Sequence, residues 1–298
     1  MIEITSCIIV VGGYNPGKKS SISTTEVFGD LVTKKLSDLP KNINGSTMVE
    51  HNGSIQLCGG LNNLKKCFQL DQGTWKEHST LNARRLWHSA VTTEKATFLF
   101  GGTSWTSWNT YEYLPKDSST WIMGNADIPG GFKDGAAIAV DSQNEIWLIG
   151  GSRTKKRILS FNVNDHTFQE LPFQLNAERI SARCAFIPNT SNIIVTGGYD
   201  SKSNHLDSTE IIDTEDGSVT MTTSSMNVQR FGHGMGIVTI NGQDRLAVFG
   251  GRNYDCLDSI ELYNIKTEKW ELTDIKLKEP KELFGYLTIK LSKILSKP

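Results

Sequence analysis

Short runs of apolar residues, each ended by a pair of glycines, recur along the whole chain. The pairs begin at Gly12, Gly59, Gly101, Gly150, Gly197 and Gly250, at intervals of 42 to 53 residues. Aliphatic and aromatic residues dominate the preceding runs, for example Ile8-Ile9-Val10-Val11. Such runs, stopped by glycine, are typical of buried β-strands rather than helices. A seventh pair, Gly130-Gly131, follows a proline outside this period and is predicted to lie in a loop.

A second pattern follows each Gly pair at a similar phase. It consists of another short strand, such as Glu261 to Asn264, then a polar turn, and in four repeats an aromatic residue. These aromatic residues are Trp75, Trp121, Phe168 and Trp270, whereas Lys35 and Val219 stand near that place in the other two repeats. The next strand often opens with Arg-x-x-His, as in Arg85 to His88 and Arg230 to His233. Four strands in each repeat, joined by turns, indicate an antiparallel all-β array.

The Gly doublet, the Glu-x-Tyr-Asn strand, the spaced tryptophan and the Arg-x-x-His segment together resemble the Kelch repeat family. The resemblance covers residues 1–298, which it implies form a single domain. It implies a six-bladed β-propeller with four antiparallel strands in each blade. Residues 1–13 supply a strand that ends in a Gly pair but has no strand before it. Residues 284–291 supply a strand of the preceding type that no Gly pair follows. We therefore predict that strands from both ends of the chain complete the first blade, which removes two open sheet edges.

Most signature residues are predicted to be structural. Glycine permits a tight strand exit and close approach of backbone, and the large aromatic residues fill the space between blades. His88 and His233 share one phase of different repeats, so they are expected in different blades rather than at one site. The histidine and cysteine spacings fit no metal site, and no cofactor is expected. Buried thiols are expected at the cysteines that lie on strands, and an odd count of five favours a reducing, cytoplasmic location.

The formal net charge of −1 excludes bulk electrostatic binding of nucleic acid or of an anionic membrane. In a four-stranded blade with strands a to d, the b–c and d–a connections emerge on the same face. The loop windows assigned to that face hold 19 basic and 10 acidic residues, against 12 and 22 in the rest of the chain. The neutral total therefore combines a basic loop face with an acidic remainder.

Arginines and aromatic residues within these loops are the candidate partner-binding residues, because they are common in binding hot spots. The candidates are Arg84, Arg85, Arg153, Arg157, Arg179, Arg230, Tyr14, Trp105, Trp108, Tyr199 and Tyr254. Arg84, Arg85, Arg179 and Arg230 recur at one loop phase and are expected to ring the mouth of the central channel. Two alternatives stay open for the periodic arginines: contact with a partner, or ties between blades. A solvated run of charge is the alternative for residues 153–157.

These features predict a non-catalytic, monomeric module that binds an acidic or phosphorylated protein or peptide on the b–c/d–a face. The Kelch resemblance implies scaffolding, commonly as the substrate-recognition part of BTB–Kelch ubiquitin-ligase adaptors, although BTB and BACK regions are not in this sequence. Two alternatives are a sugar-modifying enzyme of the sialic-acid epimerase kind, with its site in the central channel, and actin binding. No catalytic residue is assigned.

Overall fold

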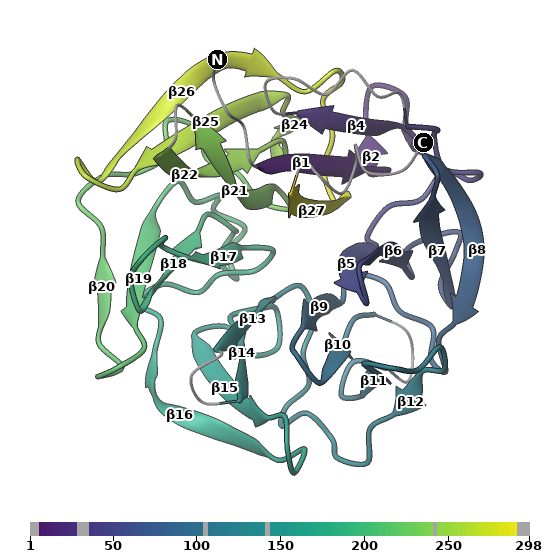
Figure 1. Cartoon of the computed structure of the whole chain (residues 1–298). Helices are drawn as coiled ribbons and strands as arrows, with labels where there is room; N and C mark the ends of the chain where they lie inside the picture. Colours follow the sequence, from purple (N-terminus) through teal and green to yellow (C-terminus); the bar gives the residue numbers. More distant parts are fainter. Residues whose placement is uncertain (1–5, 29–35, 104–106, 141–143, 241–242, 291–298) are drawn as a thin grey trace.

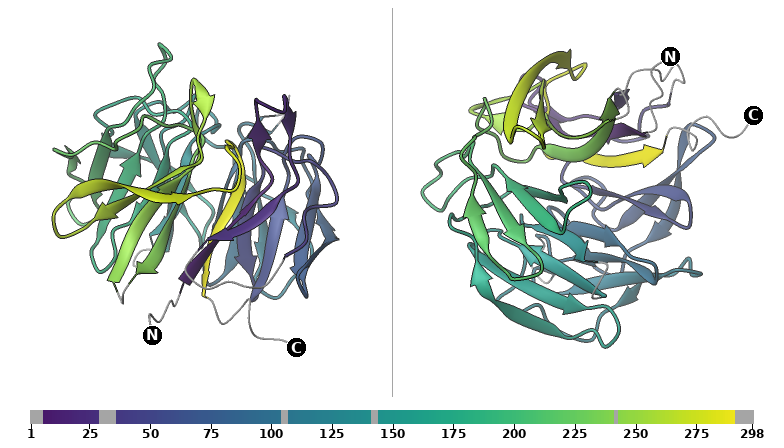
Figure 2. Two further views of the ribbon diagram at one scale, coloured as in Figure 1. Left: turned by 90° about the horizontal axis from the view of Figure 1, so that it is seen from above. Right: turned by 60° about the vertical axis from the view of Figure 1, so that its left-hand side comes forward.

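The computed structural model describes residues 6–28, 36–103, 107–140, 144–240 and 243–290. Its strands form six antiparallel sheets arranged as blades around a central channel (Figure 1). Seen from the side, the blades stand next to one another in a disc (Figure 2). The fold is therefore an all-β six-bladed propeller, as predicted. Five blades have the expected four strands, whereas blade one has three among the described residues.

The blades are numbered here in chain order. Blade one contains β27 (Gly285–Lys290), β1 (Ser6–Val11) and β4 (Thr25–Phe28). Blade two contains β5 (Thr47–His51), β6 (Ser54–Cys58), β7 (Lys66–Asp71) and β8 (Thr74–Thr80). Blade three contains β9 (Ser89–Thr92), β10 (Ala96–Phe100), β11 (Tyr111–Pro115) and β12 (Ile122–Met123).

The remaining three blades repeat this order. Blade four contains β13 (Ala136–Val140), β14 (Glu145–Ile149), β15 (Arg157–Asn162) and β16 (Phe168–Gln174). Blade five contains β17 (Arg183–Phe186), β18 (Asn192–Thr196), β19 (Thr209–Asp213) and β20 (Val219–Met221). Blade six contains β21 (Gly234–Ile240), β22 (Gln243–Phe249), β25 (Ser259–Asn264) and β26 (Lys269–Lys276).

Blade one joins the two ends of the chain, which confirms the predicted closure. Strand β27 pairs with β1 in antiparallel register over six residues, from Ser6 opposite Lys290 to Val11 opposite Gly285. Strand β4 pairs with the other edge of β1. The C-terminal strand thus holds the innermost place in the blade whose next strand is N-terminal (Figure 1).

Six hydrophobic clusters fill the spaces between neighbouring blades. Trp75 and Trp121 belong to two of these clusters, and each indole nitrogen donates to a hydroxyl on the preceding blade: Trp75 to Thr25 at 3.1 Å, and Trp121 to Ser79 at 3.2 Å. Trp270 packs in the cluster between blades five and six. The repeated aromatic residues therefore fill the inter-blade core, as the sequence predicted.

The periodic Gly pairs have the conformation and the surroundings that only glycine tolerates easily. Gly59 and Gly60 have φ values of 67° and 92°, and a Cβ on Gly59 would lie 2.7 Å from the carbonyl oxygen of Arg85. The other periodic pairs share this left-handed backbone. Gly130 and Gly131 lie in a loop, as expected, and also have positive φ values.

The b–c and d–a connections lie together on one face. Two b–c connections contain short hairpins, β2 (Tyr14–Asn15) with β3 (Ser20–Ser21) and β23 (Arg252–Asn253) with β24 (Asp255–Cys256). Backbone hydrogen bonds join each b–c connection to the d–a loop that enters the same blade, for example from the Leu61 amide to Asn44 and from the Ser152 amide to Lys133. This face is called the loop face below.

Candidate functional site

Six backbone hydrogen bonds form a closed ring at the channel mouth on the loop face. One residue of each d–a loop, two positions before the innermost strand, donates its amide to the carbonyl of the equivalent residue in the preceding blade, at 2.6 to 3.3 Å. The ring residues are Gly45, Trp87, Asp134, Ser181, Gly232 and Leu283, and the Gly45 amide closes the ring on Leu283. All six have φ between 54° and 68°. This shared left-handed conformation allows each residue to bond to its neighbour.

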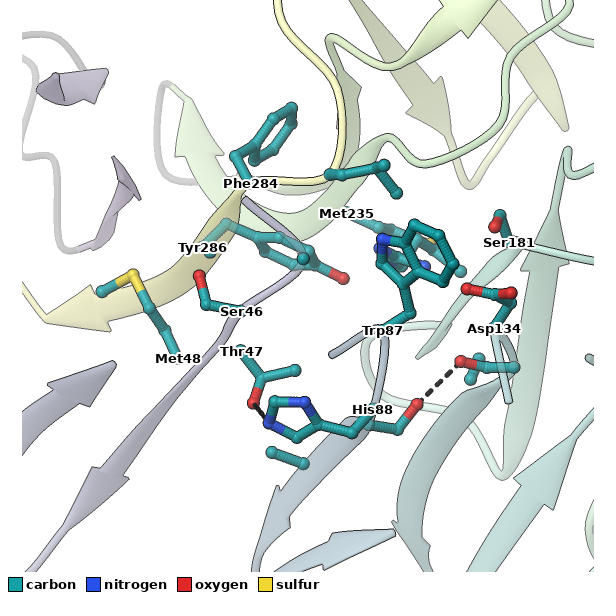
Figure 3. Close-up of a pocket in the computed structure, with 18 of the residues that line it drawn as sticks. Ser46, Thr47, Met48, Trp87, His88, Asp134, Ser181, Met235, Phe284 and Tyr286 are labelled. Carbon is teal, nitrogen blue, oxygen red and sulfur yellow. Dashed lines mark hydrogen bonds between the residues drawn. The ribbon is translucent and has the colours of Figure 1, made fainter. Parts of the chain in front are cut away.

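A cavity of about 300 Å³ lies along the channel beside this ring (Figure 3). Residues from all six innermost strands or the loops that enter them line it, including Ser46, Trp87, Asp134, Arg183 and Tyr286. Its volume is at the lower end of the range for small-molecule sites. Three polar atoms in its lining are buried without a hydrogen-bond partner among the described residues, namely Ser46 Oγ, Trp87 Nε1 and His88 Nδ1.

Asp134 and Trp87 stand next to each other in the ring, and Lys133 reaches both. The Lys133 ammonium lies 3.7 Å from the Asp134 carboxylate and 5.0 Å from the centroid of the Trp87 ring. Burial raises the pKa of Asp134 to about 6, and the positive charges of Lys133 and Arg183 oppose that rise. The mouth therefore contains one carboxyl group that titrates near neutral pH.

The structure corrects the prediction for Arg85, Arg179 and Arg230. All three side chains are completely buried, so they do not ring the mouth and cannot touch a partner. Each is ion-paired with a glutamate on the third strand of the blade it enters: Arg85 with Glu112 at 2.8 Å, Arg179 with Glu210 at 2.8 Å, and Arg230 with Glu261 at 2.6 Å. The inter-blade alternative for these arginines is the one that the structure supports.

Arg85 illustrates how such a residue joins two blades. Its guanidinium group donates to Glu112 and to the carbonyl of Gly101, both in blade three. Its own carbonyl accepts the amide of Gly60, in blade two, at 2.9 Å. The same arrangement recurs at Arg179 and Arg230. These arginines were predicted to be exposed because they lie in loops. They are buried instead, and the paired glutamate and backbone carbonyls compensate their charge.

The other candidate arginines lie on the loop face with different surroundings. Arg84 and Arg153 are exposed, and Arg153 lies over the Trp108 ring at 4.4 Å. Arg157 is half-buried, pairs with Glu170 at 3.0 Å and donates to the carbonyl of Pro129. The structure therefore brings Arg153 and Trp108 together, and it ties Arg157 to neighbouring residues.

The candidate aromatic residues divide in the same way. Tyr254 is 79% exposed and packs against His205, which contacts Phe231, which in turn contacts Tyr199. This row crosses the loop connections of blades five and six. Tyr14 is half-buried beside the d–a loop that enters blade one, with its amide bonded to Glu282 at 2.8 Å. Trp105 lies outside the described residues.

His88 and His233 occupy different blades, as predicted. Each Nε2 bonds to a threonine hydroxyl of the preceding blade, His88 to Thr47 at 2.8 Å and His233 to Thr196 at 2.9 Å. Burial, together with nearby arginines, lowers the pKa of His88 to about 3 and that of His233 well below its ordinary value. Both histidines are therefore neutral ties between blades at physiological pH.

Two cysteines differ from the expectation of buried thiols. Cys58 on β6 and Cys67 on β7 face each other in register and form a disulfide. The two residues are directly opposite each other on adjacent strands, which places their sulfurs within bonding reach. Among the described residues, no three histidine, cysteine or acidic side chains gather into a potential metal site. None of the described residues forms a helix long and apolar enough to cross a bilayer.

The sequence comparisons agree with this geometry. The family described as the KLHDC2/KLHL20/DRC7 Kelch-repeats domain matches residues 87–293, which span blades three to six and β27. Comparison with curated proteins gives no match. The matched segment covers more than half of the chain. The chain therefore belongs to this Kelch-repeat family.

Proposed function

We propose that this propeller is a non-catalytic protein-interaction module whose loop face binds an acidic or phosphorylated protein or peptide. Members of a Kelch-repeat family typically present a protein-binding surface, and the family match supports this general role. Charge and exposed aromatic area on the loop face support the finer statement about the partner. The module is proposed to be a monomer. The disulfide between Cys58 and Cys67 removes the argument from reduced cysteines for a cytoplasmic location.

The observation that carries the proposal is the pairing of Arg153 with Trp108. The guanidinium group lies 4.4 Å from the ring centroid, and no carboxylate among the described residues forms an ion pair with it. The Trp108 ring also packs on Gly131, where an added Cβ would lie 2.1 Å from the ring. An arginine stacked on a fixed tryptophan is preorganised to accept an acidic group from a partner.

Partner capture from a cell extract, followed by mass spectrometry, tests this proposal. The wild-type chain is compared with the double variant Trp108→Ala/Arg153→Glu and with a control, Lys269→Glu, on the exposed edge of blade six. We expect specific partners with the wild type and the control, and their loss with the double variant. Equal recovery with all three proteins would overturn the assignment of this surface.

A role in substrate recognition for a ubiquitin ligase is part of the same proposal. It predicts that a captured partner becomes ubiquitinated in cells when the chain is present, and that Trp108→Ala/Arg153→Glu abolishes this effect. A partner whose ubiquitination does not depend on the chain would remove this role and leave the binding function in place.

The second candidate function is a sugar-modifying activity in the channel. It is favoured by the cavity of about 300 Å³ and by Asp134, whose raised pKa suits proton transfer near neutral pH. Turnover of a carboxylate-bearing amino sugar that is lost in Asp134→Asn would support it. The absence of turnover in the wild type would leave the interaction module as the function.

A further inference from the structure

A second pocket opens on the loop face, between the b–c turn of blade two and the d–a loops on either side of that blade. Its volume is about 400 Å³. The lining residues are Lys41, Asn62, Asn63, Leu64, Lys65, Lys66 and Arg84. Four of these seven residues are basic and none is acidic. This pocket is separate from the channel cavity, with which it shares no lining residue.

Hydrogen bonds hold the three walls of this basic pocket in place. The Leu61 amide bonds to Asn44 at 2.8 Å, and the Asn62 side chain bonds to the Asn42 carbonyl at 3.1 Å. On the other side, the Arg85 amide bonds to Leu64 at 2.8 Å. The turn itself is closed by the Asn63 side chain, which donates to the Lys66 carbonyl at 2.7 Å. A rigid frame of this kind keeps the charged side chains near one another before a ligand arrives.

Three of the four positive charges have no compensating carboxylate among the residues that the structure describes. Lys66 pairs with Glu77 at 2.5 Å, which neutralises it. Lys41, Lys65 and Arg84 are exposed and form no ion pair with any residue in the described part of the chain. Like charges held together without counter-charges repel one another, and an anion bound among them relieves that repulsion.

Resting on the proposed function, we propose that this basic pocket binds a phosphate monoester, carried by a phosphorylated serine or threonine of the partner protein. A phosphate carries close to two negative charges and three strong acceptor oxygens, which suits two lysines and an arginine fork better than one carboxylate does. The pocket lies between loops, and the half-buried Leu64 is the one apolar residue in its lining. A small group of cations between loops, with one apolar residue among the seven that line it, fits a phosphopeptide rather than a membrane surface.

The test uses a fluorescent peptide made of glycine and serine with a single central phosphoserine, and the same peptide without the phosphate. Anisotropy is measured for the wild type, for Lys41→Glu/Lys65→Glu, and for Lys266→Glu/Lys269→Glu. The last pair is exposed, lies on blade six and changes the net charge equally, so it controls for long-range electrostatics. Vesicles that contain a phosphoinositide are titrated in parallel.

We expect the phosphopeptide to bind at least about tenfold more tightly than the unphosphorylated peptide, and Lys41→Glu/Lys65→Glu to abolish that difference while the control keeps it. Equal binding of both peptides, or an equal loss in the control, would overturn the proposal. Binding to vesicles without binding to the phosphopeptide would also overturn it.

Failure of this proposal can be distinguished from failure of the proposed function. Phosphatase treatment of the extract is added to the partner-capture experiment. Partners that survive phosphatase and Lys41→Glu/Lys65→Glu, but not Trp108→Ala/Arg153→Glu, would leave the interaction function standing and remove the phosphate site. Loss of partners through all three changes would support both proposals.

Discussion

The six blades use two different kinds of junction between the incoming d–a loop and the third strand. In four blades a buried cation meets a glutamate: Arg85 with Glu112, Arg179 with Glu210, Arg230 with Glu261, and Lys281 with Glu26. In blades two and four both places hold apolar residues, Ile43 with Phe68 and Phe132 with Leu159. This pair of positions therefore holds either an ion pair or two apolar side chains. No blade places a charged side chain opposite an apolar one.

The physical reason is the cost of an unpaired charge in the interior. A buried ion pair with satisfied hydrogen bonds is about as stable as a well-packed apolar pair, whereas a buried charge without its partner is strongly destabilising. The glutamates also accept backbone amides of the incoming loop, as Glu261 does from Asn227 and Val228. The charged and the apolar junction are therefore expected to be similar in stability. A junction with one charged and one apolar residue is expected to be much less stable.

The largest expected effect comes from creating such a mixture. Glu261→Leu leaves the Arg230 guanidinium buried without its carboxylate, and we expect it to lower the free energy of unfolding by about 3–5 kcal/mol. Denaturant unfolding measures the change. The double variant Arg230→Phe/Glu261→Leu imitates the junction of blade four, and we expect it to recover much of that loss. A double variant as unstable as the sum of its single changes would show that the two junction types are not interchangeable.

Replacing a buried arginine by lysine is expected to have an intermediate effect. Arg85 donates to Glu112, to the Gly101 carbonyl and to Thr110. A lysine can keep the ion pair, as Lys281 does with Glu26 at 2.5 Å, but it loses the fork geometry. We expect Arg85→Lys to cost about 1.5–3 kcal/mol in unfolding experiments. Wild-type stability in this variant would mean that charge alone, without the guanidinium hydrogen bonds, holds a charged junction.

Asp134 lies two residues after Phe132 in the loop that enters blade four, with its carboxylate 3.7 Å from the Lys133 ammonium. Its pKa is raised to about 6 in the folded protein, so the unfolded chain ionises at lower pH than the folded one. Stability from this group is present below about pH 4 and is lost as pH rises toward 6. We expect Asp134→Asn to raise stability at pH 7 by on the order of 1–2 kcal/mol and to have little effect at pH 4. Thermal unfolding at both values measures this, and the same gain at both would exclude ionisation as the cause.

The smallest effect is expected at the other apolar junction. Ile43→Val removes one methylene from a fully buried side chain, and we expect a loss of about 0.5–1.5 kcal/mol in denaturant unfolding. No charge is exposed or created, so the loss should not depend on ionic strength. A loss as large as that of Glu261→Leu would remove the distinction between the two kinds of junction.

The propeller itself could be predicted because its signals are local and repeated. The Gly pairs at Gly59 and Gly101 mark places where a backbone carbonyl of the loop that leads into the next blade lies too close for a side chain. The Trp75 and Trp121 positions likewise report one packing requirement in successive blades. Most blades need the same residue types at the same positions, and the repetition of these residues along the sequence identifies the fold.

The site was harder to predict because loop position does not determine burial. Arg84 and Arg85 are neighbours in one loop, yet the first is exposed and the second is completely buried. A signal for Arg85 existed in the sequence: repeats with a cation at this position have a glutamate on the third strand, and repeats with Ile43 or Phe132 have Phe68 or Leu159 there. Nothing comparable marked the basic pocket, since Lys41, Lys65 and Arg84 meet only when three separate loops are folded together.

The closed ring of backbone hydrogen bonds at the channel mouth has an electrical consequence. Each amide points to its neighbour in the same rotational sense, from Gly45 back to Leu283 and so around all six blades. The in-plane parts of six peptide dipoles arranged head to tail in a circle sum to nearly zero, unlike the aligned dipoles at the end of a helix. The mouth thus has no preferred sign of charge from its backbone in that plane. Any preference must come from side chains such as Asp134, Lys133 and Arg183, so a few substitutions there could reverse it without altering the frame.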